Sequence, residues 1–76
     1  MDAPTAVIAE DEPALRAALR AHLARLWPEL AIAGEAADGV EALGMIERTR
    51  PQVAILDIEM PEMTGLDLAR RIADRC

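Results

Sequence analysis

The sequence predicts an α/β fold in which three parallel strands alternate with three helices. Three short apolar runs, at residues 6–9, 30–36 and 53–56, each precede a stretch with apolar side chains at helical spacing. Strands that alternate with helices of about 10–15 residues are typical of crossover connections and a parallel sheet. The 76 residues leave room for one small domain, and their regular apolar pattern excludes a disordered tail.

The first strand is expected at residues 6–9, an apolar run that stops abruptly at Glu10. Such a run is typical of a strand that is buried on both faces. Pro13 suits the first turn of the helix that follows, because a backbone N–H would have no partner there. The apolar stripe of this helix consists of Leu15, Leu19, Leu23 and Leu26. The first helix should therefore end near Leu26.

The second strand and helix are expected between residues 30 and 50. Residues 30–36 alternate weakly around Ile32, as a strand would. Asp38 is followed three residues later by Glu41, a variant of the capping box, so a helix should begin there. Pro51 closes this element. Its predicted apolar stripe is Val40, Leu43 and Ile46.

The third strand is expected at residues 53–56, another buried-strand run, which ends at Asp57. Thr64 can cap a third helix that begins directly after it. The side chains predicted to face inward from this helix are Leu66, Ala69, Ile72 and Ala73.

The composition excludes several classes of function. The net charge of −6 disfavours nonspecific binding to nucleic acid or to an anionic membrane. The longest run without a charged residue is residues 3–9, far short of the ~20 apolar residues of a membrane span. All eight basic residues are arginines. With one cysteine there is no disulfide framework, and neither is a secretory signal expected, so the expected location is the cytoplasm.

Acidic residues follow two of the predicted strands. Glu10 and Asp11 follow the first strand and Asp57 follows the third. Because the carboxyl ends of parallel strands meet at one edge of a sheet, these carboxylates should converge. Such a cluster favours a cation, and Mg²⁺ takes one or two carboxylates while leaving room for phosphate oxygens. A carboxylate can also attack phosphorus, and Asp57, alone at its strand end, is the better candidate nucleophile.

Four segments carry a resemblance over nearly the whole chain: residues 10–13, 37–43, 53–60 and 60–65. Together they resemble the receiver domain of two-component response regulators. The resemblance implies a three-layer, flavodoxin-like (CheY-like) fold with strand order 2-1-3. It also implies that the first helix covers one face of the sheet and the other two helices cover the opposite face. Residues 1–76 are then the N-terminal part of such a domain, with strands four and five and helices four and five absent.

The resemblance further implies a phosphorelay function, with a sensor histidine kinase as the phosphoryl donor and Asp57 as the acceptor. Asp11 would bind Mg²⁺ directly together with Asp57, Glu10 would hold a metal-bound water, and Glu59 would offer its backbone carbonyl. The sequence of residues 59–63 is similar to that of receivers joined to a LytTR-type DNA-binding output domain, which is absent from this chain. Because the strand-five lysine and the strand-four hydroxyl have no counterpart here, phosphotransfer should be impaired.

Two other functions remain open. One is a phosphorylation-independent interaction or dimerisation module derived from a receiver domain. The other is a haloacid-dehalogenase-like phosphatase, which Met60 and Pro61 disfavour because Gly-Thr is expected at that place. The outer edge of residues 53–56 is apolar and should be open, so a homodimer is expected, through edge pairing or exchange of elements.

Overall fold

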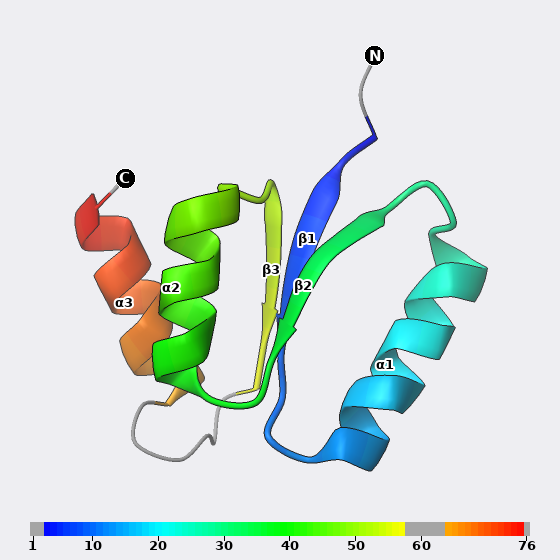
Figure 1. Ribbon diagram of the computed structural model, residues 1–76, viewed down its shortest axis with the longest axis horizontal. Coiled ribbons are helices and arrows are strands. Elements are labelled where there is room, and N and C mark those ends of the chain that lie inside the picture. The colour runs from blue at the N-terminus through cyan, green and yellow to red at the C-terminus, as the bar shows by residue number, and fades with distance from the viewer. Residues whose placement is uncertain (1–2, 58–63, 76) are drawn as a thin grey trace.

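The computed structural model describes residues 3–57 and 64–75 and contains the six elements expected from the sequence (Figure 1). In chain order these are β1 (Thr5–Ala9), α1 (Pro13–Leu26), β2 (Ala31–Ala36), α2 (Gly39–Thr49), β3 (Val53–Leu56) and α3 (Gly65–Arg75). The predicted alternation of strands and helices is confirmed.

The three strands form one parallel sheet in the order β2-β1-β3. The pairing of β1 with β3 sets Ala9 opposite Leu56, so the carboxyl ends of these two strands lie side by side. Helix α1 lies on one face of the sheet, and α2 and α3 lie on the other (Figure 1). The predicted strand order and distribution of helices are therefore confirmed. Given this order, right-handed crossovers between parallel strands place α1 and α2 on opposite faces of the sheet.

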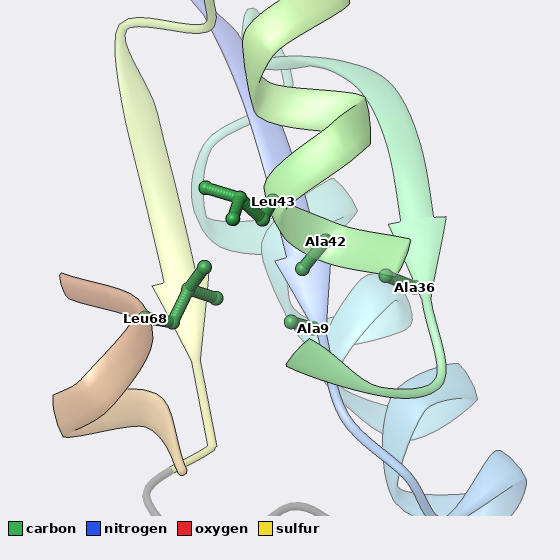
Figure 2. Close-up of a cluster of buried hydrophobic side chains, with 5 residues drawn as sticks. All are labelled: Ala9, Ala36, Ala42, Leu43 and Leu68. Atoms are coloured by element: carbon green, nitrogen blue, oxygen red, sulfur yellow. The ribbon is translucent and has the colours of Figure 1, made fainter. Parts of the chain in front are cut away.

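The core lies between the sheet and the α2–α3 layer (Figure 2). Its buried cluster consists of Ala9, Ala36, Ala42, Leu43 and Leu68. Three of these five side chains are alanines, so α2 can approach the strands closely. Gly34 of β2 permits the same close approach, because a Cβ atom there would overlap the side chain of Met45. This packing holds β1 in place, and Glu10 and Asp11 directly follow that strand.

The predicted inward faces of α2 and α3 are partly wrong. Val40 is 55% exposed, although Leu43 and Ile46 of the same predicted stripe are buried. In α3 the core residue is Leu68, at 0% exposure, whereas Leu66 is 65% exposed. Residues two apart on a helix of ~3.6 residues per turn point in nearly opposite directions, so only one of these leucines can face the sheet.

The prediction for α3 chose the wrong one of two stripes that share Ile72. Ala69 and Ala73, which belong to the stripe of Leu66, are exposed, and Ile72 is half-buried beside the core cluster. Each stripe contains one leucine together with Ile72, so apolar area alone does not choose between them. The observed face is the one on which Leu68 fits into the core cluster.

Helix α1 packs less deeply than its leucine stripe suggested. None of its residues is buried, and Leu15 and Leu26 are largely exposed. A cavity of about 220 Å³ lies against the C-terminal half of α1, lined by Arg20, Leu23, Ala24, Pro28, Leu30 and Ile32. No helix within residues 3–57 and 64–75 is long and apolar enough to cross a membrane.

Candidate functional site

Backbone hydrogen bonds at the ends of the strands place the acidic residues at one edge of the sheet. The N–H of Glu10, the first residue after β1, donates to the carbonyl oxygen of Ala36 at 3.0 Å. The N–H of Asp57, the first residue after β3, donates to the carbonyl oxygen of Ala9 at 2.9 Å. Both bonds extend the parallel pairing by one residue, so Glu10 and Asp57 leave adjacent strands at the same level.

Three of the predicted site residues come together. Glu10, Asp11 and Asp57 each offer a carboxylate oxygen, and these oxygens lie within 4.8 Å of one another. Asp11 is exposed, whereas Glu10 and Asp57 are half-buried. The fourth predicted residue, Glu59, lies outside the described part of the chain.

The neighbouring groups perturb the carboxyl group of Glu10. The N–H of Glu12 donates to Oε2 of Glu10 at 3.0 Å, and this hydrogen bond lowers the pKa of Glu10. Desolvation, hydrogen bonding with Asp11 and Asp57, and repulsion by the Asp57 charge act in the opposite direction. Together they raise the pKa of Glu10 above its ordinary value of 4.5. The cluster therefore favours a positive charge near Glu10, either a proton or a cation.

The donor set fits magnesium. Three carboxylates supply hard oxygen ligands, the type that Mg²⁺ prefers, and the exposure of Asp11 leaves one side open to water. Mg²⁺ keeps several of its waters and accepts one or two carboxylates, so the three need not all bind it directly. Glu10, Asp11 and Asp57 are the residues that would hold the ion.

One residue beside the cluster was missed in the sequence. Nη1 of Arg16, on the second turn of α1, donates to the backbone carbonyl oxygen of Glu10 at 2.8 Å. Its sequence signal is weak: Arg16 follows Leu15 of the apolar stripe, and an arginine at such a position usually extends into solvent. Here its side chain is only 22% exposed.

Comparison with known proteins agrees with this geometry. The family model of the response regulator receiver domain matches residues 6–76. The chain belongs to this family. The predicted resemblance to receiver domains is therefore confirmed, and the match covers all six elements of the fold.

Individual relatives match this receiver chain closely but are longer. An uncharacterized response regulatory protein of Vibrio cholerae is 52% identical over 68 residues, which cover 90% of this chain and 26% of that protein. A protein-glutamate methylesterase/protein-glutamine glutaminase of Myxococcus xanthus is 46% identical over 87% of this chain and 18% of its own length. The crystal structure of a LuxR-family DNA-binding response regulator from Staphylococcus aureus superimposes with a TM-score of 0.84 at 39% identity, covering 95% of this chain and 59% of that one.

These matches identify a phosphorelay signalling domain of two-component systems rather than a catalytic domain. The methylesterase relative is named for an enzymatic activity, but this chain matches less than a fifth of its length. The match with this chain covers 26% and 18% of the length of these two curated relatives and 59% of the solved structure. The alternative of a phosphorylation-independent module is not favoured by these matches.

Proposed function

We propose that Asp57 accepts a phosphoryl group at a magnesium site formed by Glu10, Asp11, Asp57 and the backbone carbonyl of Glu59. The observation that supports the proposal is the convergence of three carboxylate oxygens within 4.8 Å at the carboxyl ends of β1 and β3. In a parallel sheet this edge is where ligands bind. Membership of the receiver family supplies the reaction class.

The chemistry required of Asp57 is nucleophilic attack. A lone pair of its carboxylate oxygen forms the new O–P bond, and the bond from phosphorus to the donor's leaving group breaks, so that the leaving group keeps the electron pair. Mg²⁺, when bound, supplies positive charge that offsets the charge of the phosphoryl oxygens. Glu10 and Asp11 hold the ion close to Asp57, and without a cation their charges would repel the incoming phosphoryl group.

Incubation with acetyl phosphate tests the assignment of Asp57. Mass spectrometry should detect one added phosphoryl group in the wild-type chain with Mg²⁺, and none with EDTA or in Asp57→Asn. Asp74→Asn, which removes an exposed carboxylate of α3, is the matched control and should be modified like the wild type. Since the 76 residues contain no lysine, we expect slow modification. Equal modification of Asp57→Asn, or modification that ignores EDTA, would contradict the proposal.

The partners follow from the same proposal. We propose a sensor histidine kinase as the phosphoryl donor, a LytTR-type output domain as the recipient of the signal, and the cytoplasm as the location. A homodimer is proposed through β3, which within the described residues pairs with β1 on one side only. An open, uncharged strand edge is a template for pairing with another chain. Sedimentation equilibrium should show a dimer at micromolar concentration, and a folded monomer would contradict edge pairing.

A further inference from the structure

Glu10 is fixed at three separate points. Its N–H donates to the carbonyl oxygen of Ala36, and its carboxylate accepts the N–H of Glu12. Its carbonyl oxygen accepts Nη1 of Arg16 at 2.8 Å. The first two contacts come from the sheet and from the loop itself. The third comes from α1, and it fixes the peptide group that joins Glu10 to Asp11.

Arg16 is itself oriented by an acidic residue of the sheet. Nε of Arg16 lies 3.7 Å from Oε1 of Glu35 in β2, and the other oxygen of Glu35 pairs with Arg20. The side chains of Arg16 and Glu35 are 22% and 25% exposed, so water only partly screens their attraction. A planar guanidinium has donors in a rigid fork, so Arg16 can contact Glu35 through Nε and the Glu10 carbonyl through Nη1 together. One side chain thus connects β2 to the loop between β1 and α1.

We infer that Arg16, held by Glu35, is a positioning residue for the acidic cluster, and that it sets the direction in which Asp11 leaves the end of β1. The inference rests on the magnesium site of the proposed function. Arg16 acts through the Glu10–Asp11 peptide, because its hydrogen bond is to the Glu10 carbonyl rather than to a carboxylate of the cluster.

The direction in which Mg²⁺ affinity changes when the charge of Arg16 is removed distinguishes a positioning role from a purely electrostatic one. Arg16 carries a positive charge near a cation site, so on charge alone Arg16→Gln should tighten Mg²⁺ binding. If Arg16 positions the loop, Arg16→Gln should instead weaken binding, since groups that orient metal ligands typically contribute 10–100-fold in affinity. We expect a weakening of about 10-fold, at the lower end because Arg16 acts through the backbone.

Titration with MgCl₂, followed by calorimetry, is the primary experiment. Arg16→Gln should weaken Mg²⁺ binding about 10-fold, and Arg16→Lys, which keeps the charge and one donor, should restore part of the loss. Arg20→Gln is the matched control: it removes an arginine of the same helix that pairs with the same Glu35, but not the hydrogen bond to Glu10. Its affinity should stay within about twofold of the wild type.

A second measurement needs no metal. In EDTA, hydrogen exchange at the N–H of Glu12, which is bonded to the Glu10 carboxylate, should be several-fold faster in Arg16→Gln and unchanged in Arg20→Gln. Glu35→Gln should also accelerate it, because Arg16 then loses its anchor. If circular dichroism shows that Arg16→Gln does not fold, hydrogen exchange at the N–H of Glu12 in Glu35→Gln tests the role of Arg16 instead.

The outcomes separate this inference from the proposed function. Wild-type binding of Mg²⁺ together with equal or tighter binding by Arg16→Gln overturns the role of Arg16 and leaves the site intact. Unchanged exchange at Glu12 in both Arg16→Gln and Glu35→Gln overturns it as well. A wild-type chain that binds no Mg²⁺ overturns the metal site and this inference together.

Discussion

Replacing Glu10 by glutamine should stabilise the metal-free chain at neutral pH. The substitution removes one of three negative charges whose oxygens lie within 4.8 Å of one another. Glutamine keeps an oxygen that can accept the N–H of Glu12, so the loop retains that hydrogen bond. The main change is therefore the loss of repulsion between Glu10 and its two neighbours, Asp11 and Asp57.

The size of the gain follows from the distances. Two unit charges 4.8 Å apart repel each other by about 0.9 kcal/mol in water, and Glu10 faces two such charges. Screening over a Debye length of about 8 Å at physiological salt reduces the sum to about 1 kcal/mol. A neutral amide accepts its hydrogen bond more weakly than a carboxylate, which offsets part of this gain. We expect a net stabilisation of about 0.5–1 kcal/mol.

The gain should depend on pH. Because the pKa of Glu10 is raised above 4.5 in the folded chain, the folded state binds its proton more tightly than the unfolded state does. This contribution to wild-type stability is fully present below pH 4.5 and is lost as the pH rises through the raised pKa. Glutamine at position 10 does not titrate, so Glu10→Gln does not lose this contribution. Its gain in free energy of unfolding over the wild type should therefore be absent at about pH 3.5 and complete at about pH 7.

Urea denaturation in EDTA, followed by circular dichroism, measures the difference. Glu29→Gln, which removes an exposed carboxylate just before β2, is the matched control and should show no such pH-dependent gain. The advantage of Glu10→Gln should also shrink at 1 M salt, where the Debye length is about 3 Å. A folded Glu10→Gln variant that is no more stable at neutral pH, or equally favoured in acid, would refute the repulsion argument.

Four further substitutions test the packing and the capping of the helices. Leu68→Ala should reduce the free energy of unfolding by about 2–5 kcal/mol, and Leu66→Ala by no more than about 0.5 kcal/mol, in urea denaturation; equal losses would contradict the assigned face of α3. Asp38→Ala, which removes the side-chain cap of α2, should cost about 1 kcal/mol in the same assay. Gly34→Ala should cost no more than about 1 kcal/mol, because the Met45 atoms that it would overlap belong to the flexible end of that side chain, and a smaller residue at Met45 should remove the cost in a thermal melt.

The features that could be predicted from the sequence depend on local chemistry or on general topology. The helix cap is local: Oδ1 of Asp38 accepts the N–H of Glu41 at 2.8 Å, as the spacing predicted. The carboxylate of Glu41 reaches back one residue further than in a standard capping box and accepts the N–H of Ala37 at 3.1 Å. The convergence of Glu10 and Asp57 needed only the rule that parallel strands bring their carboxyl ends together. Neither feature required knowledge of how the helices are rotated.

The features that could not be predicted depend on competition between nearly equal choices. Two stripes of α3 share Ile72, and only the three-dimensional fit of Leu68 against α2 and the sheet decides between them. The Arg16–Glu35 pair joins residues 19 positions apart on different elements, and no local pattern specifies which carboxylate an arginine of α1 meets. The sequence therefore indicates which residues form the acidic cluster but not which residue holds its loop in place.

The attachment of α1 connects the fold to the site. The buried cluster lies on the other face of the sheet, and no residue of α1 is buried. Arg16 and Arg20 of α1 make polar contacts with the rest of the domain: both pair with Glu35, and Arg16 also donates to the carbonyl of Glu10. Half-exposed ion pairs contribute only about 0–1 kcal/mol each, so these contacts constrain the position of α1 more than they stabilise the fold. A shift of α1 across the sheet must therefore move or break the hydrogen bond to Glu10, which makes the placement of α1 and the geometry of the acidic cluster interdependent.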